Sequence, residues 1–258
     1  YDLIAGRSVI RELTDAEEVI YRKYLTDPHN PYHTFIHESG HCSYDWEMVI
    51  GHGLPGLIKK ARDSMESQTD NGRKLLLQSH IHVYEAIGRY LLRYAEAAEC
   101  RGMLDLAETL RKAALEKPAD FRTALQLLWI ITLVNCAYLS ENPTLTVGRL
   151  DQILYPYYIA DIEKGVLTKE EAFELICCLW IKLYLNYDVQ QSCVGGTAPD
   201  GSSQVNELSY MMLDATEQLD FIRCMSVRYS RNTDKAFLKR ALEVVGHVQK
   251  GVPFFLND

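Results

Sequence analysis

The segment His37-Glu38-Ser39-Gly40-His41 matches H-E-x-x-H, the pattern in which two histidines bind zinc and a glutamate acts as the base of a hydrolase. That chemistry requires both histidines on one turn of a helix. The serine and glycine inside the motif are poor helix residues, and Pro28 and Pro31 precede it, so the sequence predicts a loop here. A zinc hydrolase is retained as an alternative, and histidines of a loop or pocket without a metal are the favoured interpretation.

Other reactive side chains form weaker patterns. Cys177 and Cys178 are neighbours on an apolar segment with no histidine or other base close by, which favours small core residues over redox or catalytic thiols. Gly195-Gly196 and Asp200-Gly201 fit a turn better than a phosphate-binding loop. The tyrosines in 155–158 are more typical of packing than of a ligand cage. These residue types alone indicate an α/β domain and assign no active site.

Charge and cysteine content exclude some classes of partner. The 258 residues include 27 basic and 35 acidic side chains, and the net charge of −8 disfavours nucleic acid and anionic membranes, which require clustered basic surfaces. The apolar stretch 125–139 is too short to cross a bilayer and contains Gln126 and Asn135, so it predicts a buried helix. Seven scattered cysteines and no signal peptide predict a cytoplasmic protein. Tyr1 and Asp258 are expected to be ends cut from a longer chain.

Hydrophobic periodicity and capping residues predict a helix-rich α/β chain. Strands are expected at 225–229 and, as a buried strand, at 253–256. Their alternation with helices in the second half predicts a sheet or barrel, and no linker divides the chain. The predicted helices span 14–25, 45–65 with a kink at its glycines and Pro55, 70 onward with the apolar face Leu76, His80, Val83, Ile87, Tyr90 and Tyr94, then 103–115, 119–138, 151–163, 168–185, 207–219 and 234 to the stop signal at Gly251.

Longer motifs follow one another along most of the chain. They are Leu3-Ile4-Ala5-Gly6, Gly40-His41 ahead of Gly53-Leu54, Gly148-Arg149-Leu150-Asp151-Gln152-Ile153-Leu154-Tyr155-Pro156-Tyr157-Tyr158, Gly195-Gly196 with Asp200-Gly201, Asn206-Glu207-Leu208-Ser209-Tyr210, Ser226-Val227-Arg228, and Gly251-Val252-Pro253-Phe254-Phe255-Leu256-Asn257-Asp258. In this order and spacing, the chain resembles glycyl radical enzymes of the pyruvate formate-lyase and glycerol dehydratase type. It resembles the dehydratase branch more than pyruvate formate-lyase itself.

The resemblance implies a ten-stranded β/α barrel wrapped in helices, of which this chain is a helix-rich part. In that family a glycyl radical oxidises a cysteine on a central loop, and the thiyl radical takes a hydrogen atom from the substrate in a site closed to water and oxygen. Neither the Arg-Val-x-Gly radical motif nor the Gly-Cys-x-Glu loop occurs in the sequence. Residues 1–258 are therefore expected to be part of a single pyruvate formate-lyase-like domain whose catalytic half is absent, with no catalytic residue and no metal ligand of its own.

The same resemblance implies one wall of a substrate pocket. His41 matches a histidine that approaches the substrate in some relatives, where it accepts a hydrogen bond from a hydroxyl or assists a leaving group. A loop histidine bonded to backbone is the open alternative. Pro143 stands where diol and hydroxyproline dehydratases carry a polar substrate contact, which disfavours a glycerol-like substrate, and Thr144 matches a serine that contacts glycerol-type substrates. Arg149 and Asp151 are expected to be structural, paired or capping.

The function implied is that of a glycyl radical lyase, either a dehydratase or eliminase or a formate acetyltransferase-like enzyme of anaerobic metabolism, acting on a small polar metabolite. This segment supplies scaffold and pocket wall and is inactive alone. The expected partners are the substrate, a second copy in a homodimer, and the radical S-adenosylmethionine activating enzyme that installs the glycyl radical. A truncated, non-catalytic relative with a binding or structural role is the second interpretation, and the zinc hydrolase of His37, Glu38 and His41 is the third.

Overall fold

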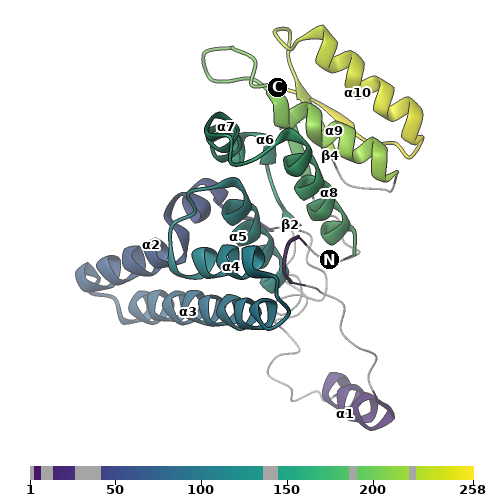
Figure 1. Cartoon of the computed structure of the whole chain (residues 1–258). Coiled ribbons are helices and arrows are strands. Elements are labelled where there is room, and N and C mark those ends of the chain that lie inside the picture. Colours follow the sequence, from purple (N-terminus) through teal and green to yellow (C-terminus); the bar gives the residue numbers. More distant parts are fainter. Residues whose placement is uncertain (1–2, 7–13, 27–41, 136–144, 186–190, 221–224) are drawn as a thin grey trace.

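The computed structural model describes residues 3–6, 14–26, 42–135, 145–185, 191–220 and 225–258. Within these ranges the chain is helix-rich α/β, as predicted. A group of helices from the first half packs beside a second group that lies against short parallel strands (Figure 1). No helix of the described residues is long and apolar enough to cross a membrane.

The first half is a helical layer. It contains α2 (Trp46–Ser67), α3 (Asn71–Glu99), α4 (Leu104–Leu115) and α5 (Phe121–Val134), while α1 (Asp15–Thr26) lies apart from them at the bottom of Figure 1. Helix α5 is buried on every side except near its two ends, because its sequence is almost wholly apolar. The buried helix predicted from the stretch beginning at residue 125 is confirmed over its described part.

Local capping sets where these helices begin. Asp45, Asp70 and Asp120 each accept a hydrogen bond from the backbone N–H three residues further on, at the starts of α2, α3 and α5. The kink predicted inside the second helix is confirmed at Gly53, whose φ of 63° and ψ of 175° break the helical path two residues before Pro55.

The predicted apolar face of α3 is only partly correct. Leu76 and Val83 are 57% and 45% exposed, whereas Ile87, Leu91 and Ala95 are buried. Helix α3 has 29 residues, and the shorter α4 returns antiparallel to it beside its C-terminal half. The period of the sequence therefore indicates a helix, but only the apolar side chains on a face that meets a neighbouring helix are buried.

The second half alternates helices with strands, as predicted. Its helices are α6 (Leu150–Ile153), α7 (Tyr155–Lys164), α8 (Lys169–Leu185), α9 (Glu207–Leu219) and α10 (Lys235–Val248). The single helix predicted for 151–163 is two helices, since the chain turns at residue 154 and a proline occupies the first turn of α7. The capping box predicted at the start of α8 is confirmed by hydrogen bonds between the residues at 168 and 171.

Five short strands run parallel to one another. Within the described residues they are β1 (Cys42–Ser43), β2 (Leu145–Thr146), β3 (Ser192–Gly195), β4 (Met225–Tyr229) and β5 (Phe254–Asn257), arranged as a β1-β2 pair and a β3-β4-β5 sheet. A parallel bridge between residues 148 and 192, with backbone hydrogen bonds of 2.8 and 2.9 Å beside it, joins the pair to the sheet. The neighbouring strands thus follow the order of the sequence.

The last strand contradicts the prediction that it is buried. Phe254, Phe255 and Leu256 are 49%, 36% and 46% exposed, and β5 is the edge of its sheet. Its apolar composition predicts a strand correctly, but burial depends on a neighbour that the described residues do not provide.

The extended segment 3–6 joins the two halves. Gln126 of α5 exchanges hydrogen bonds of 2.7 and 3.0 Å with the backbone of Ala5. The carbonyl of Gly6 accepts from Trp129 Nε1 at 3.2 Å and from Lys182 Nζ of α8 at 2.8 Å. Side chains of α5 and α8 therefore satisfy the backbone of a segment that belongs to no sheet.

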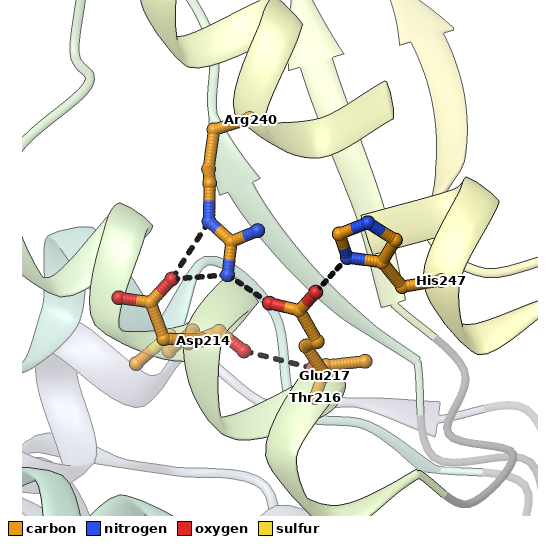
Figure 2. Close-up of polar contacts among 6 residues, drawn as sticks. Asp214, Thr216, Glu217, Arg240 and His247 are labelled. Carbon is orange, nitrogen blue, oxygen red and sulfur yellow. Dashed lines mark hydrogen bonds and ion pairs between the residues drawn. The ribbon is translucent and has the colours of Figure 1, made fainter. Parts of the chain in front are cut away.

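Helices α9 and α10 are linked by an ion-pair cluster, shown in Figure 2. Arg240 Nε and Nη2 lie 2.9 and 2.7 Å from Asp214 Oδ1, Arg240 also bonds Glu217, and Glu217 bonds His247. The carboxylates of Asp214 and Glu217 are 49% and 26% exposed, so water screens the cluster.

Replacing Arg240 with alanine is expected to lower the free energy of unfolding by only about 1 kcal/mol, because all three charged side chains are partly exposed and water screens them. Urea denaturation in low salt and in high salt measures the effect, which should shrink as salt rises. Lys239→Ala is the control, since Lys239 is 80% exposed and pairs with Glu243 one turn on. A loss at Arg240 that salt does not change would contradict the electrostatic explanation.

Candidate functional site

The site residues predicted from the sequence fall outside the described residues. His41, Pro143 and Thr144 lie in the ranges 27–41 and 136–144, and so do the histidines of the zinc motif. Among the residues that are described, no group of three His, Cys, Asp or Glu side chains is placed to hold a metal ion.

Polar side chains gather at the carboxyl ends of the parallel strands. Arg149 and Asp151 follow β2, Gly195-Gly196 ends β3, Arg228 lies near the end of β4, and Asp258 follows β5. Ligands of open α/β sheets bind outside the carboxyl ends of the strands. We call these residues the strand-end cluster, and it is the best candidate site within the described ranges.

Asp151 is the buried carboxylate of the strand-end cluster. It is fully buried, and its Oδ2 accepts hydrogen bonds from Gly195 N at 2.6 Å and Ser209 Oγ at 2.5 Å. Burial raises the pKa of Asp151 to about 6, against the hydrogen bonds from Ser209 and Gly195 and the positive charge of Arg149, which lower it. Asp151 thus has a structural role, as predicted, because it holds the residue at the end of β3 and a side chain in the first turn of α9.

Two successive glycines turn the chain at the end of β3. Gly195 and Gly196 have φ values of 74° and 97°, and Arg149 Nη2 donates to the carbonyl of Gly195 at 2.6 Å. A β-carbon on Gly196 would lie 3.0 Å from both Arg149 Nη2 and Asp258 Oδ2. The turn therefore requires glycine for its backbone angle and for the close approach of two charged groups.

An ion pair ties β4 to the end of β5. Arg228 Nε and Nη2 lie 2.6 and 2.5 Å from Asp258 Oδ1, and Asp258 Oδ2 accepts from the backbone N–H of Thr197 at 2.7 Å. Burial alone would raise the pKa of Asp258, but the hydrogen bond and charge of Arg228, with the N–H of Thr197, hold it below its usual value. The pair therefore stays ionised at neutral pH.

The register of the sheet separates its two faces. Cys193, Ser226 and Phe254 lie side by side, as do Gly195, Arg228 and Leu256 two residues on, so these six share one face. The intervening Val194 and Val227 are fully buried on the other face, in the main core. We call the first the open face, because Phe254 and Leu256 are about half exposed there.

A small cavity adjoins the strand-end cluster at the ends of β1 and β2. Its volume is about 290 Å³, close to the lower limit for small-molecule sites. Tyr44 and Trp46 meet edge to face at 5.3 Å in its wall. Its lining residues are Tyr44, Asp45, Trp46, Glu47, Gly148, Arg149, Gln152, Ile153 and Gln204. Arg149 and Gln204, joined by a hydrogen bond of 2.6 Å, belong both to this wall and to the contacts around Gly195.

A larger cavity of about 540 Å³ lies between α7, α8 and α9, and its polar side chains make it a weaker candidate for a functional site. Glu207 accepts from Tyr158 Oη at 2.9 Å and from Lys169 Nζ at 2.7 Å. The hydrogen bond from Lys169 is the main cause that lowers the pKa of Glu207. The central groups already satisfy one another, and acidic residues in the first turns of α8 and α9 stabilise the helix dipoles.

Cys177 and Cys193 are protonated at neutral pH. Burial raises the pKa of Cys177 to about 11 and also raises the pKa of Cys193. A thiol, rather than a thiolate, is a poor nucleophile and metal ligand. This supports the prediction that Cys177 and Cys178 are packing residues.

The strand-end cluster includes two residues that sequence reasoning assigned to motifs but not to a site, Arg228 and Asp258. A signal for them exists, because each is a charged residue inside or directly after a short apolar strand, where charge is unusual. The spacing between them does not show that they form an ion pair, because that contact depends on the parallel pairing of β4 with β5.

Comparison with known families matches residues 7–258 to the family described as pyruvate formate lyase-like. The chain belongs to that family. The resemblance inferred from the ordered motifs is thereby confirmed.

The trans-4-hydroxy-L-proline dehydratase of Clostridioides difficile is 33% identical over 179 residues, which cover 63% of this chain and 23% of the dehydratase. The 4-hydroxyphenylacetate decarboxylase glycyl radical subunit of C. difficile strain CD196 is 29% identical over 252 residues, covering 81% of this chain and 27% of the subunit. The glycerol-bound, B12-independent glycerol dehydratase from Clostridium butyricum superposes with a TM-score of 0.77 at 29% identity, over 85% of this chain and 31% of that one.

The pyruvate formate lyase-like chain therefore spans about a quarter to a third of the length of the relatives it matches. These relatives are dehydratases and a decarboxylase subunit, and isethionate sulfite-lyases are also similar, at 25% identity over 83% of this chain for that of Desulfovibrio desulfuricans. The chain thus belongs to an enzyme family, and the relatives it matches act on small polar molecules.

Proposed function

We propose that these residues belong to a glycyl radical lyase, of the dehydratase or eliminase kind, that acts on a small polar metabolite. Residues 1–258 supply scaffold and one wall of its pocket. The observation that carries this proposal is the match to glycyl radical dehydratases and lyases over more than four fifths of the chain, in sequence and in fold. A formate acetyltransferase-like reaction is a less favoured member of the same proposal.

The strands support a partial barrel. The five parallel strands of the described ranges lie in sequence order, and β5 leaves one edge of the sheet and the apolar side chains of Phe254 and Leu256 exposed. A further parallel strand beside β5 would pair that edge and cover those side chains. We infer that this set is part of a ten-stranded β/α barrel that further strands complete.

In this proposal a glycyl radical, on a residue that this sequence does not contain, supplies the oxidising power for hydrogen abstraction through a cysteine. The open face fits such chemistry, since it presents the apolar side chains of Phe254 and Leu256 beside the Arg228–Asp258 ion pair, which is neutral as a whole. Further strands that close over it would exclude water, which radical chemistry requires. The described residues would hold the strand ends in place and shield the site.

The pocket wall proposed from the motifs consists of His41, Pro143 and Thr144. His41 and Thr144 each stand directly before a strand of the β1-β2 pair, whose registered residues are Cys42 and Leu145, which supports a shared wall. Pro143 offers no side-chain hydrogen bond, so a substrate other than glycerol is favoured. We further propose a cytoplasmic homodimer that a radical S-adenosylmethionine enzyme activates.

The decisive experiment is anaerobic purification of the native protein, a measurement of its intact mass, and activation by the radical S-adenosylmethionine enzyme. We expect a mass several-fold above 29.5 kDa per chain and the doublet of a glycyl radical in electron paramagnetic resonance. Turnover with trans-4-hydroxyproline, propane-1,2-diol, glycerol, isethionate and 4-hydroxyphenylacetate would then define the substrate. A native chain of 29.5 kDa, or a full-length chain that forms no radical, would overturn the proposal in favour of a non-catalytic relative.

A further inference from the structure

The Gly195-Gly196 turn connects the two sides of the strand-end cluster. On one side, Gly196 N donates to the carbonyl of Arg228 at 2.9 Å, and the next amide, of Thr197, donates to Asp258 Oδ2 at 2.7 Å. The positions of the turn and of the Arg228–Asp258 ion pair are therefore linked by two consecutive backbone amides. A displacement of the turn by a fraction of an ångström would lengthen both hydrogen bonds.

On the other side, the first residues of the α6 region hold both polar groups of Gly195. Asp151 Oδ2 accepts from its N–H at 2.6 Å, and Arg149 Nη2 donates to its carbonyl at 2.6 Å. A glycine in a turn has the widest backbone freedom of any residue, so its position is determined by such contacts rather than by its own conformation.

Burial of Asp151 is costly in a way that simple packing does not explain. The carboxyl group is fully buried, its Oδ1 has no hydrogen-bond partner among the described residues, and burial works against its ionised form. Asp151 is absent from the lining of the neighbouring cavity. The carboxylate accepts hydrogen bonds from Gly195 and Ser209, and these offset part of that cost. Of the two, only the hydrogen bond from Gly195 connects Asp151 to the open face.

We propose that Asp151 is a positioning residue of the site: acting through Gly195, it sets the place of the Arg228–Asp258 ion pair at the carboxyl ends of β4 and β5. The catalytic importance of this positioning rests on the proposed function. The positioning itself is a property of the chain described here and is measurable without turnover.

Three variants of the chain separate positioning from charge and from stability. Asp151→Ala removes the acceptor of the Gly195 N–H, Asp151→Asn removes the charge but keeps an acceptor oxygen, and Ser209→Ala removes the other donor to the same carboxylate while leaving Gly195 bound. The readouts are the pKa of the Asp258 side chain, by carbon-detected NMR titration, and hydrogen exchange at the amide of Thr197.

We expect the pKa of Asp258 to rise toward the ordinary aspartate value of 3.8 in Asp151→Ala, and the amide of Thr197 to exchange about tenfold faster, as for one lost hydrogen bond. Asp151, with a pKa of about 6, is already protonated at the pH where Asp258 titrates, so loss of its charge alone would leave the pKa of Asp258 unchanged, and a rise reports displacement of the ion pair. Asp151→Asn should restore slow exchange, and Ser209→Ala should leave both readouts unchanged.

An unchanged or lowered pKa of Asp258 in Asp151→Ala, with unchanged exchange at Thr197, would overturn the proposal. So would equal changes in Ser209→Ala, because a general loss of stability would then explain them. If Asp151→Ala does not fold, Arg149→Lys weakens the other half of the grip on Gly195 and should accelerate exchange at Thr197, and no acceleration would count against the proposal.

The full-length enzyme tests the catalytic consequence. We expect Asp151→Ala to lower kcat at an unchanged yield of glycyl radical, with recovery in Asp151→Asn. Absence of the radical in the unsubstituted enzyme would overturn the proposed function and would leave the NMR result on Asp258 standing. An unchanged kcat in Asp151→Ala would limit the role of Asp151 to the fold.

Discussion

Replacing Gly196 with alanine is expected to lower the free energy of unfolding by about 3 kcal/mol and to displace the ion pair between Arg228 and Asp258. The φ of 97° costs a residue with a β-carbon about 1–2 kcal/mol, and the new carbon would stand 3.0 Å from both Arg149 Nη2 and Asp258 Oδ2. These groups carry charge-assisted hydrogen bonds worth about 1.5–3 kcal/mol each, so moving them adds to the loss. Urea denaturation followed by tryptophan fluorescence measures the change.

Gly165→Ala is the matched control for this prediction. Gly165 ends α7 with a φ of 68°, and no atom lies within 4 Å of the position that a β-carbon would take. Alanine there meets the backbone strain without the contact, and a loss of about 1 kcal/mol is expected. Equal losses at Gly165 and Gly196 would show that Arg149 and Asp258 move aside without cost, and the tight packing around Gly196 would then have no energetic importance.

Asp151→Asn is expected to change the dependence of stability on pH by about 3 kcal/mol. The pKa of Asp151 is about 6 in the folded chain and about 3.8 when unfolded, so between these values the folded state binds more protons. The contribution of Asp151 to the free energy of unfolding therefore falls as pH rises from about 4 to 6 and is level above that. At about 1.4 kcal/mol for each unit between the two pKa values, the total is about 3 kcal/mol.

The measurement is the difference in unfolding free energy between Asp151→Asn and the unsubstituted chain at pH 4, 5, 6, 7 and 8. Asparagine does not titrate, so the variant should gain on the unsubstituted chain as pH rises to 6 and keep that gain above it. Carboxylates with lowered pKa, such as Glu171 and Asp258, give slopes of the opposite sign, but they are common to both proteins and cancel. If the stability of the variant instead falls relative to the unsubstituted chain as pH rises, Arg149 and the hydrogen-bond donors lower the pKa of Asp151 more than burial raises it.

Helix and strand positions with strong local signals are well predicted from the sequence. The helix over 207–219 and the strand over 225–229 have the bounds expected for them. Asn206 caps that helix with Ser209 in a reciprocal pair of hydrogen bonds, a signal confined to four residues. The kink at Gly53 and the capping box at the start of α8 are likewise predicted from segments of only a few residues.

Burial is predicted less well, because it depends on neighbours. Leu76 and Val83 continue the apolar period of α3 but are exposed, and Phe254 and Leu256 form an apolar strand that nothing in the described ranges covers. An apolar side chain is more stable when a neighbouring element buries it, but the sequence does not show whether such an element is present. The exposed β5 is thus an observation about the fold, and it supports the proposal that further strands pair there.

The family and the helix-rich α/β class were determined by the sequence alone, through ordered motifs and short-range capping and periodicity, and the family match confirms them. The predicted pocket wall of His41, Pro143 and Thr144 stays a prediction. The strand-end cluster was decided only by the tertiary structure, because Asp151 meets Gly195 across 44 residues and Thr197 meets Asp258 across 61. Such contacts depend on which strands are parallel neighbours, and no local interaction along the chain encodes that pairing.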